Sequence, residues 1–132
     1  MNHVVARFQD GRTLKGLTND FLPTKSVFHL QIEGSTPAAK PMELDVSGLK
    51  ALFFVKDLGG DPGHKKTNAF DPFKPAIGRK VRVEFKDGEV LVGTTQGYQP
   101  GRPGFFMVPA DARSNNERCF IVSSATAQVV LV

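Results

Sequence analysis

The residues whose side chains could do chemistry are few, and they are scattered along the chain. The histidines are His3, His29 and His64, and none has another His, a Cys or a carboxylate cluster at the spacing of a metal site. Cys119 is the single cysteine, it lies in a predicted strand, and no His is placed to orient it as a nucleophile. We therefore expect a buried, inert thiol at Cys119, a packed or edge position for His29 and a solvent-exposed His64.

The carboxylates and glycines carry no catalytic pattern. Glu43 and Asp45 lie two residues apart on one predicted strand and share one solvated face, whereas a glycosidase pair faces across a cleft. Asp10 and Asp87 each precede a glycine, which is typical of a tight turn. No Gly-rich loop follows a strand and opens a helix, so nucleotide-fold fingerprints are absent. We expect a protein that is not an enzyme and needs no cofactor or metal.

Length and composition bound the class of protein. The chain has 132 residues, of which 40% are apolar and 23% charged, so it can bury a core as one compact domain or two very small ones. No apolar run approaches the roughly 20 residues that cross a bilayer, and the first residues lack the pattern of a secretory signal. A lone cysteine fits a reducing compartment. We expect a cytoplasmic protein without a membrane span.

An internal repeat is the strongest signal in the sequence. The segment from Phe8 to Gly16 recurs at an offset of 77, from Phe85 to Gly93, with Asp-Gly and the final Gly aligned. A second block aligns at an offset of 76, where Ala51 matches Ala127 and Phe54-Val55 matches Val130-Leu131. Self-similarity at a fixed offset marks a repeated structural unit. We predict a first repeat over residues 1–58, a connector over 59–78 and a second repeat over 79–132.

Each copy has the pattern of short β-strands. Val81, Val83 and Phe85 alternate with charged residues, so they share one face of a strand. The Asp-Gly pairs predict type I′ hairpin turns, and Gly16 and Gly93, inside the following strands, predict a bend or a close backbone approach. The predicted strands cover 4–8, 12–18, 27–32, 42–46 and 51–55, then 81–85, 89–95, 104–108, 118–122 and 127–132.

Five strands with one short turn before the last indicate a small barrel of SH3 or Sm type in each copy. We therefore predict an all-β protein of two tandem five-stranded small barrels, packed as one pseudo-two-fold unit. A barrel of about 50 residues is marginal alone, so the copies should share a core. An exchange of strands between the copies is the alternative arrangement.

The connector concentrates the positive charge. Residues 56–82 hold seven basic and three acidic side chains, which equals the whole formal net charge of +4. Such a segment can contact phosphates, and the alternative is a solvated linker. The candidate nucleic-acid contacts are Lys65, Lys66, Arg79, Lys80 and Arg82.

Three aromatic residues fall at or beside predicted loops. Phe21, Tyr98 and Phe105 could form a platform that meets a peptide, and the alternative is that they close the barrel core.

The hairpin and the aromatic that follows it resemble the first motif of Sm-like proteins. That motif corresponds to Asp10-Gly11-Arg12 through Gly16 to Phe21, and to Asp87-Gly88 through Gly93 to Tyr98. The segment 46–55 is similar to the second motif of that family. The resemblance implies a small β-barrel, assembly into rings and single-stranded RNA as a ligand.

The whole tandem pattern also resembles an uncharacterised bacterial family that accompanies PilZ-type cyclic di-GMP receptors. The residues that carry this resemblance are Pro103-Gly104-Phe105-Phe106 and the segment from Leu49 to Asp57. Taken together, these observations predict a non-catalytic binding or regulatory module whose partner is a protein. The alternatives are binding of single-stranded RNA through the basic connector and a degenerate cyclic di-GMP receptor. The sequence is also compatible with an oligomer.

Overall fold

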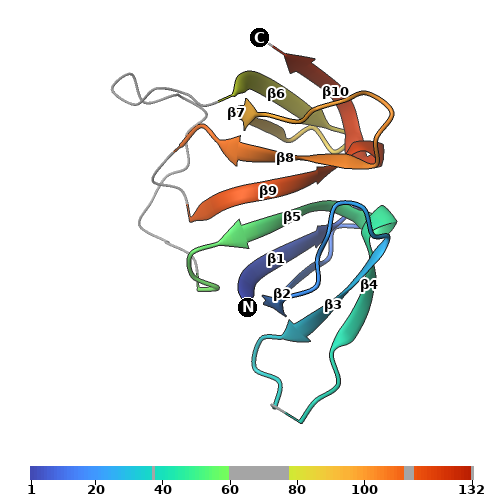
Figure 1. The fold of residues 1–132 in the computed structure, drawn as a ribbon, viewed down its shortest axis with the longest axis vertical. Helices are drawn as coiled ribbons and strands as arrows, with labels where there is room; N and C mark the ends of the chain where they lie inside the picture. Colours follow the sequence, from blue (N-terminus) through green and yellow to red (C-terminus); the bar gives the residue numbers. More distant parts are fainter. Residues whose placement is uncertain (37, 60–77, 112–114, 132) are drawn as a thin grey trace.

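A computed structural model describes residues 1–36, 38–59, 78–111 and 115–131, and the described residues form an all-β protein (Figure 1). None of these residues belongs to a helix that is long and apolar enough to cross a membrane. The expected connector contacts Lys65 and Lys66, as well as His64, lie outside the described residues.

The strands fall where the alternating patterns predict them, and they divide between two halves of the chain. The first half contains β1 Asn2–Phe8, β2 Thr13–Thr18, β3 Val27–Ile32, β4 Met42–Asp45, the 3₁₀ turn η1 Val46–Gly48 and β5 Leu49–Val55. The second half contains β6 Arg79–Phe85, β7 Val90–Thr95, β8 Gly104–Pro109, β9 Asn116–Val122, the 3₁₀ turn η2 Ser123–Ala125 and β10 Thr126–Leu131.

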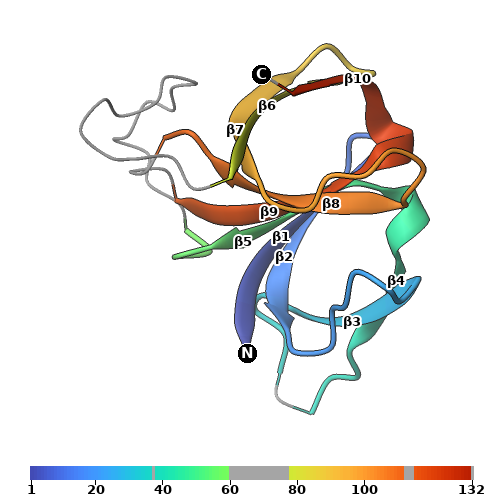
Figure 2. The same cartoon turned by 45° about the horizontal axis from the view of Figure 1, so that its top comes forward.

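All these strands belong to one ten-stranded antiparallel sheet, counted over the described part of the chain. Its order is β10-β6-β7-β8-β9-β5-β1-β2-β3-β4, so each half keeps the same internal order. The two halves meet where β5 pairs with β9, and Figure 2 shows both halves curling away from that junction. The outermost of these strands are β10 and β4, and the sheet that they bound does not close on itself.

The junction joins strands that are not counterparts in the two halves. A two-fold relation would bring matching surfaces together, so that each contact occurs twice. Here β5 of the first half pairs with β9 of the second, while β4 and β10 lie at opposite ends of the sheet. The predicted pseudo-two-fold packing is therefore wrong, and the halves are arranged head to tail. The strands of each half pair within that half, apart from this one ladder.

The hairpin turns differ from the predicted type I′. That type needs a positive φ at two central residues, but in these turns only Gly11 and Gly88 have one, at 95° and 94°. The Gly11 amide donates to Phe8 O, and the Phe8 amide donates to Arg12 O, which are the bonds of a three-residue hairpin loop with a left-handed glycine. Asp10 accepts a hydrogen bond from the Arg12 amide, so it shapes the turn as predicted.

The offset of 77 holds through the last strands, where the sequence alignment placed 76. In the first half Phe54 pairs with Val4, and in the second half Leu131 pairs with Val81, so Leu131 is the counterpart of Phe54. The ladder between β8 and β9 likewise matches the ladder between β3 and β4 at 77. The offset of 76 is wrong because the residue match that suggested it, Ala51 with Ala127, does not join equivalent positions. Each final ladder has its β-bulge at the same place, at Lys50 and at Ala127, which are 77 residues apart.

Two hydrophobic clusters lie on opposite faces of the junction. Leu52 and Phe54 of β5 join the first cluster, whereas Ala51, Phe53 and Val55 join the second. The strand β9 is divided in the same way, because Phe120 belongs to the first cluster and Cys119 and Ile121 to the second. Every residue of β5 is consequently buried. The halves share their cores, as the small size of each one requires.

Candidate functional site: a groove between the two halves

A groove of about 540 Å³ lies where the loop before the third strand of each half meets the 3₁₀ turn. Within each half one backbone hydrogen bond holds these two segments together. The Val46 amide donates to Ser26 O in the first half, and the Ser123 amide donates to Pro103 O in the second, both at 2.9 Å. The halves are also tied beside the groove, because the side-chain amide of Gln9 donates to Ser47 O and to the Ser124 hydroxyl.

The lining of the groove consists of matching residues from the two halves. Apart from Pro23, every described lining residue has its counterpart 77 positions away in the lining as well. The first half supplies Thr24, Lys25, Ser26, Asp45, Val46 and Ser47, and the second supplies Gly101, Arg102, Pro103, Val122, Ser123 and Ser124. The head-to-tail arrangement thus builds one site from corresponding segments of the two halves.

The groove is positively charged. Lys25 and Arg102 occupy equivalent positions in the two loops, and both are exposed. Neither side chain forms an ion pair with another residue of the described part of the chain. Two cations on neighbouring loops can bind a carboxylate or a phosphate, and such charge-assisted hydrogen bonds are about twice as strong as neutral ones.

Asp45 supplies the one carboxylate among the described lining residues, and it is already engaged. It precedes η1, and its Oδ1 accepts from the Ser47 amide at 2.9 Å and from the Ser47 hydroxyl at 2.8 Å. These bonds lower the pKa of Asp45, the bond from the Ser47 backbone most of all. Asp45 therefore orders the turn that lines the groove instead of pairing with Lys25 or Arg102.

The floor of the groove is apolar. Pro23, Val46, Pro103 and Val122 contribute apolar side chains to the lining, which also includes four serines. Among the described residues no aromatic side chain lines the groove. This combination suits an extended chain with apolar and acidic groups better than it suits stacked bases, which need aromatic faces.

The three aromatics predicted as an interaction platform pack into the cores. Phe21 packs edge-on against Phe28 at 5.3 Å and against Phe120 at 5.1 Å between ring centroids. Tyr98 packs against Phe105 at 4.8 Å, and Phe105 is 4% exposed. These contacts correspond to the alternative prediction, closure of the core, rather than to a platform that is free to meet a peptide.

The structure does not bring the predicted basic residues to the groove. Arg79, Lys80 and Arg82 are exposed on β6, where Val81 and Val83 between them are buried. Arg79 lines a separate hollow together with Tyr98 and Leu131, at the outer end of the second half.

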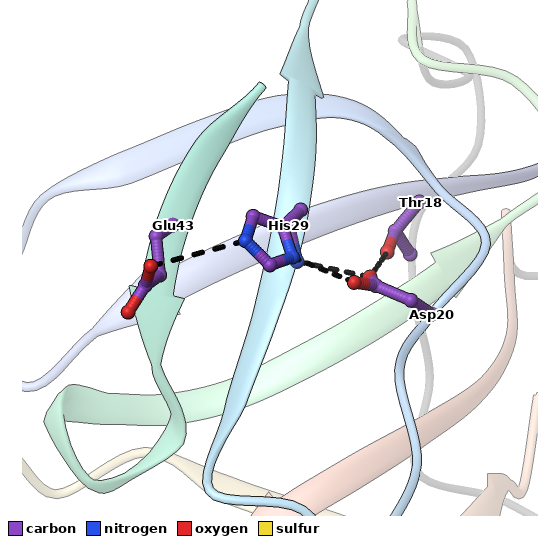
Figure 3. Close-up of polar contacts among 4 residues, drawn as sticks. All are labelled: Thr18, Asp20, His29 and Glu43. Atoms are coloured by element: carbon purple, nitrogen blue, oxygen red, sulfur yellow. Dashed lines mark hydrogen bonds and ion pairs between the residues drawn. The ribbon is translucent and has the colours of Figure 1, made fainter. Parts of the chain in front are cut away.

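A polar cluster in the first half joins Thr18 at the end of β2, Asp20 in the loop that follows, His29 of β3 and Glu43 of β4 (Figure 3). His29 Nδ1 lies 2.7 Å from Asp20 Oδ2, and His29 Nε2 lies 3.8 Å from Glu43 Oε2. Thr18 donates its hydroxyl to Asp20 at 3.2 Å. Desolvation acts to raise the pKa of Asp20, but hydrogen bonds from the His29 amide and ring and from Thr18 outweigh it, so the pKa is lowered.

The order of these contacts does not match a nucleophilic triad. In such a triad the imidazole lies between the hydroxyl and the carboxylate. Here the Asp20 carboxylate lies between Thr18 and His29, so the imidazole is not placed to take the hydroxyl proton. Nor do the described residues contain a group of three or more His, Cys, Asp or Glu side chains that could hold a metal ion. His29 is exposed on β3, which pairs with both β2 and β4, and its partner across the ladder is Glu43.

Cys119 is buried, with 0% exposure, in the ladder that joins the halves. Its partner across the junction is Phe53, and its sulfur lies 3.7 Å from Met107 O. Arg118 points to the opposite face and covers the rings of Phe54 and Phe106. The expectation of a buried thiol is confirmed.

Sequence reasoning missed Lys25 and Arg102, the two cations of the groove. The signal that identifies them is their offset of 77 within Pro-containing loops. That offset shows two equivalent cations, but it does not show that the loops meet, because this depends on how the halves pack.

Comparison with known proteins gives one family match. Residues 1–132 match the sequence model of a family of unknown function, DUF6982. No curated protein and no solved structure matches the chain.

Proposed function

Since the chain belongs to the family of unknown function DUF6982, we propose its function from the groove: it is a non-catalytic binding module that holds an extended, acidic segment of a partner protein. The observation that carries this proposal is the pair Lys25 and Arg102, two equivalent cations on one apolar groove with no carboxylate partner among the described residues. We also infer that the halves are tandem copies of one Sm-like or SH3-like unit, since strand order and register recur at an offset of 77.

The groove favours a peptide for three reasons. Its volume of about 540 Å³ lies within the range of about 300–1,000 Å³ typical of ligand sites. Its apolar floor can bury alternate side chains of an extended segment, which point to opposite sides of the backbone. Its cations can pair with acidic side chains at the rim, where charge complementarity sets specificity and association rate.

The test is a binding titration with defined fluorescent peptides. One peptide alternates apolar residues with Asp, and its control carries Lys in place of each Asp. We expect the acidic peptide to bind the protein and the basic one not to bind. The double substitution Lys25→Glu and Arg102→Glu should weaken binding by about tenfold or more, as loss of charge-assisted hydrogen bonds predicts.

A matched control separates the groove from net charge. Lys40→Glu with Lys86→Glu changes the same number of charges at exposed positions outside the groove, so binding should persist. If both double variants lose the peptide equally, or if no acidic peptide binds, the groove is not the site.

Single-stranded RNA is the alternative ligand. A titration with a fluorescent single-stranded RNA, run on the same variants, distinguishes RNA binding from peptide binding. Phosphate contacts weaken steeply between about 50 and 200 mM salt because counterions are released on binding. Arg79, Lys80 and Arg82 would then carry the contacts, with Lys65 and Lys66 of the connector. The peptide proposal would be replaced if RNA binding persists in the Lys25→Glu, Arg102→Glu variant but is lost in an Arg79→Glu, Arg82→Glu variant.

A further inference from the structure

The junction between the halves shows how the edge of β5 and the edge of β9 bind one another in this protein. Phe53 of β5 lies opposite Cys119 of β9, and both are buried, at 5% and 0% exposure. On one side of this ladder Lys50 of β5 reaches the second half, where its Nζ lies 2.7 Å from Asp87 Oδ2 and 4.7 Å from the centroid of the Phe85 ring.

On the other side of the ladder the second half fills the core of the first. Phe106 and Phe120 pack against Phe21 at 6.1 and 5.1 Å between ring centroids. Phe106 also lies 6.0 Å from Phe54. Each half thus inserts side chains into a recess of the other.

The two outer edges of the sheet are the counterparts of the two edges that meet in the junction. At the offset of 77, β10 corresponds to β5, and β4 corresponds to β9. Val130 is then the counterpart of Phe53, and Met42 is the counterpart of Cys119. Val130 and Met42 are large apolar residues with 36% and 46% exposure, although their counterparts are buried.

Each outer edge also carries a hollow at the place that the junction fills. Beside β4 a hollow of about 590 Å³ is lined by Phe8, Asp10, Arg12 and Met42, among others. Phe8, Asp10 and Arg12 are the counterparts of Phe85, Asp87 and Glu89, which receive Lys50.

The hollow beside β10 has a volume of about 340 Å³, and its lining includes Tyr98 and Leu131. These are the counterparts of Phe21 and Phe54, which receive Phe106 and Phe120. The sheet therefore ends in two hollows, each lined in part by counterparts of residues that the internal junction covers.

We propose that copies of this chain assemble head to tail, with β10 of one copy paired to β4 of the next in the register of the internal junction. Val130 then lies opposite Met42, and Gln128 lies opposite Leu44. His29 and Glu43, the counterparts of Phe106 and Phe120, enter the hollow of the neighbouring copy that Arg79 lines. The charges of Glu43 and Arg79 are complementary across this contact.

The composition of the edges suits a contact that forms between separate molecules. Glu43 and Gln128 are the counterparts of Phe120 and Ala51 in the internal junction. Because Glu43 and Gln128 are polar, an unpaired outer edge is compatible with water. Pro41 precedes β4 and has no amide hydrogen, and the internal ladder ends at Ile121, the counterpart of Leu44, so the new ladder covers only Met42 to Leu44. A head-to-tail contact generates a ring when its rotation closes and a filament when it does not. Every new contact would also bring two groove-lining segments of neighbouring copies together.

The test is the mass in solution, measured by light scattering after size-exclusion chromatography over a range of concentrations. We expect a mass above the 14.4 kDa of one chain, increasing with concentration. Val130→Glu alone and Met42→Lys alone should each yield single chains, with melting curves that show a folded protein. The double variant should assemble again, because the introduced carboxylate of one copy would lie opposite the introduced ammonium group of the next.

The control is Val108→Glu, a change at an apolar residue with 53% exposure that lies on the inner strand β8. It should leave the mass unchanged. A single-chain mass for the unmodified protein at the highest concentration overturns the proposal. The proposal is also overturned if the protein forms a dimer and only one of the two single substitutions dissociates it. That result would indicate a two-fold contact between identical edges. Failure of the double variant to reassemble also overturns the proposed register. These outcomes are independent of Lys25 and Arg102, so they leave the peptide proposal standing.

Discussion

At the scale of single residues, the most consequential side chain is Lys50. The alternating pattern of β5 does not predict that Lys50 is buried. It is only 8% exposed, and it joins the halves through ion pairs with Asp87 and Glu89. Burial acts to lower the pKa of Lys50, but hydrogen bonds from its ammonium group to the two carboxylates raise it above the ordinary value. Lys50 therefore stays charged although it is buried at the junction.

Replacement of Lys50 should loosen the junction. We expect Lys50→Met to lower the free energy of unfolding by about 1–3 kcal/mol, because its charge-assisted hydrogen bonds are lost while most of the packing is kept. Lys50→Ala should cost more, since most of the buried aliphatic stem is lost as well. Urea denaturation of the three proteins measures both effects, and equal stability of all three would show that the contact contributes nothing.

Lys50 also makes stability depend on pH. The hydrogen bond from Lys50 and the bond from the Glu89 amide hold the pKa of Asp87 below its ordinary value. A carboxyl with a lowered folded-state pKa stabilises the fold above its unfolded-state pKa, and this contribution is lost as the pH falls through the folded-state value. We expect the free energy of unfolding to decline below about pH 4. The decline should be shallower in Lys50→Met, as a pH series of urea titrations would show; identical slopes would contradict this assignment.

At the scale of elements, the glycines inside the second strand of each half set the distance between neighbouring strands. A Cβ at Gly16 would collide with the backbone oxygen of Gln31, and a Cβ at Gly93 would collide with the backbone oxygen of Val108. The predicted close backbone approach is confirmed at both positions. The sequence pattern sufficed here because a glycine inside a strand typically marks a bulge, a bend or a close approach of another backbone.

Alanine at either glycine should therefore push two strands apart. We expect Gly16→Ala and Gly93→Ala each to lower the free energy of unfolding by about 1–3 kcal/mol, the usual cost of overpacking. The matched control is Gly48→Ala, where an added Cβ has no neighbour within 4 Å and should change stability by less than about 0.5 kcal/mol. Thermal melting of the three variants provides the comparison, and a similar cost at all three positions would refute the close-approach argument.

At the scale of the whole molecule, the junction makes the two halves depend on each other. The second cluster includes Ala51, Phe53 and Val55 from the first half, and the first cluster includes Phe120 and Val122 from the second. Neither half can keep a complete core alone. The groove that carries Lys25 and Arg102 exists for the same reason, because its walls come from both halves.

Cys119 reports on the integrity of this junction. Its thiol is buried opposite Phe53, so a thiol reagent should modify it only when the halves separate or unfold. We expect slow modification of the native protein and fast modification in urea. Phe53→Ala should accelerate the native reaction, because it removes the side chain that covers the ladder. Rapid modification of the unchanged protein would mean that the halves part readily.

The strands, the hairpins and the offset of 77 between matching positions could all be predicted from the amino-acid sequence. These features depend on local physics: alternation of apolar residues selects strands, and Asp-Gly selects a tight turn. The type of the hairpin turn was not predicted correctly. It depends on the hydrogen-bond partners of the Phe8 and Gly11 amides, which the residue types alone do not specify. The offset of the final strands was predicted wrongly because the chance match of Ala51 with Ala127 suggested 76, whereas the ladders pair equivalent residues at 77.

The choice of which edges meet required the folded molecule. Each half offers two strand edges, and sequence patterns within a half cannot choose among the pairings of these edges. That choice depends on packing between residues far apart in the chain, such as Phe21 with Phe106 and Lys50 with Asp87. The head-to-tail arrangement buries β5 and the last four residues of β9, leaves Val130 and Met42 exposed at opposite ends, and places Lys25 and Arg102 on one groove.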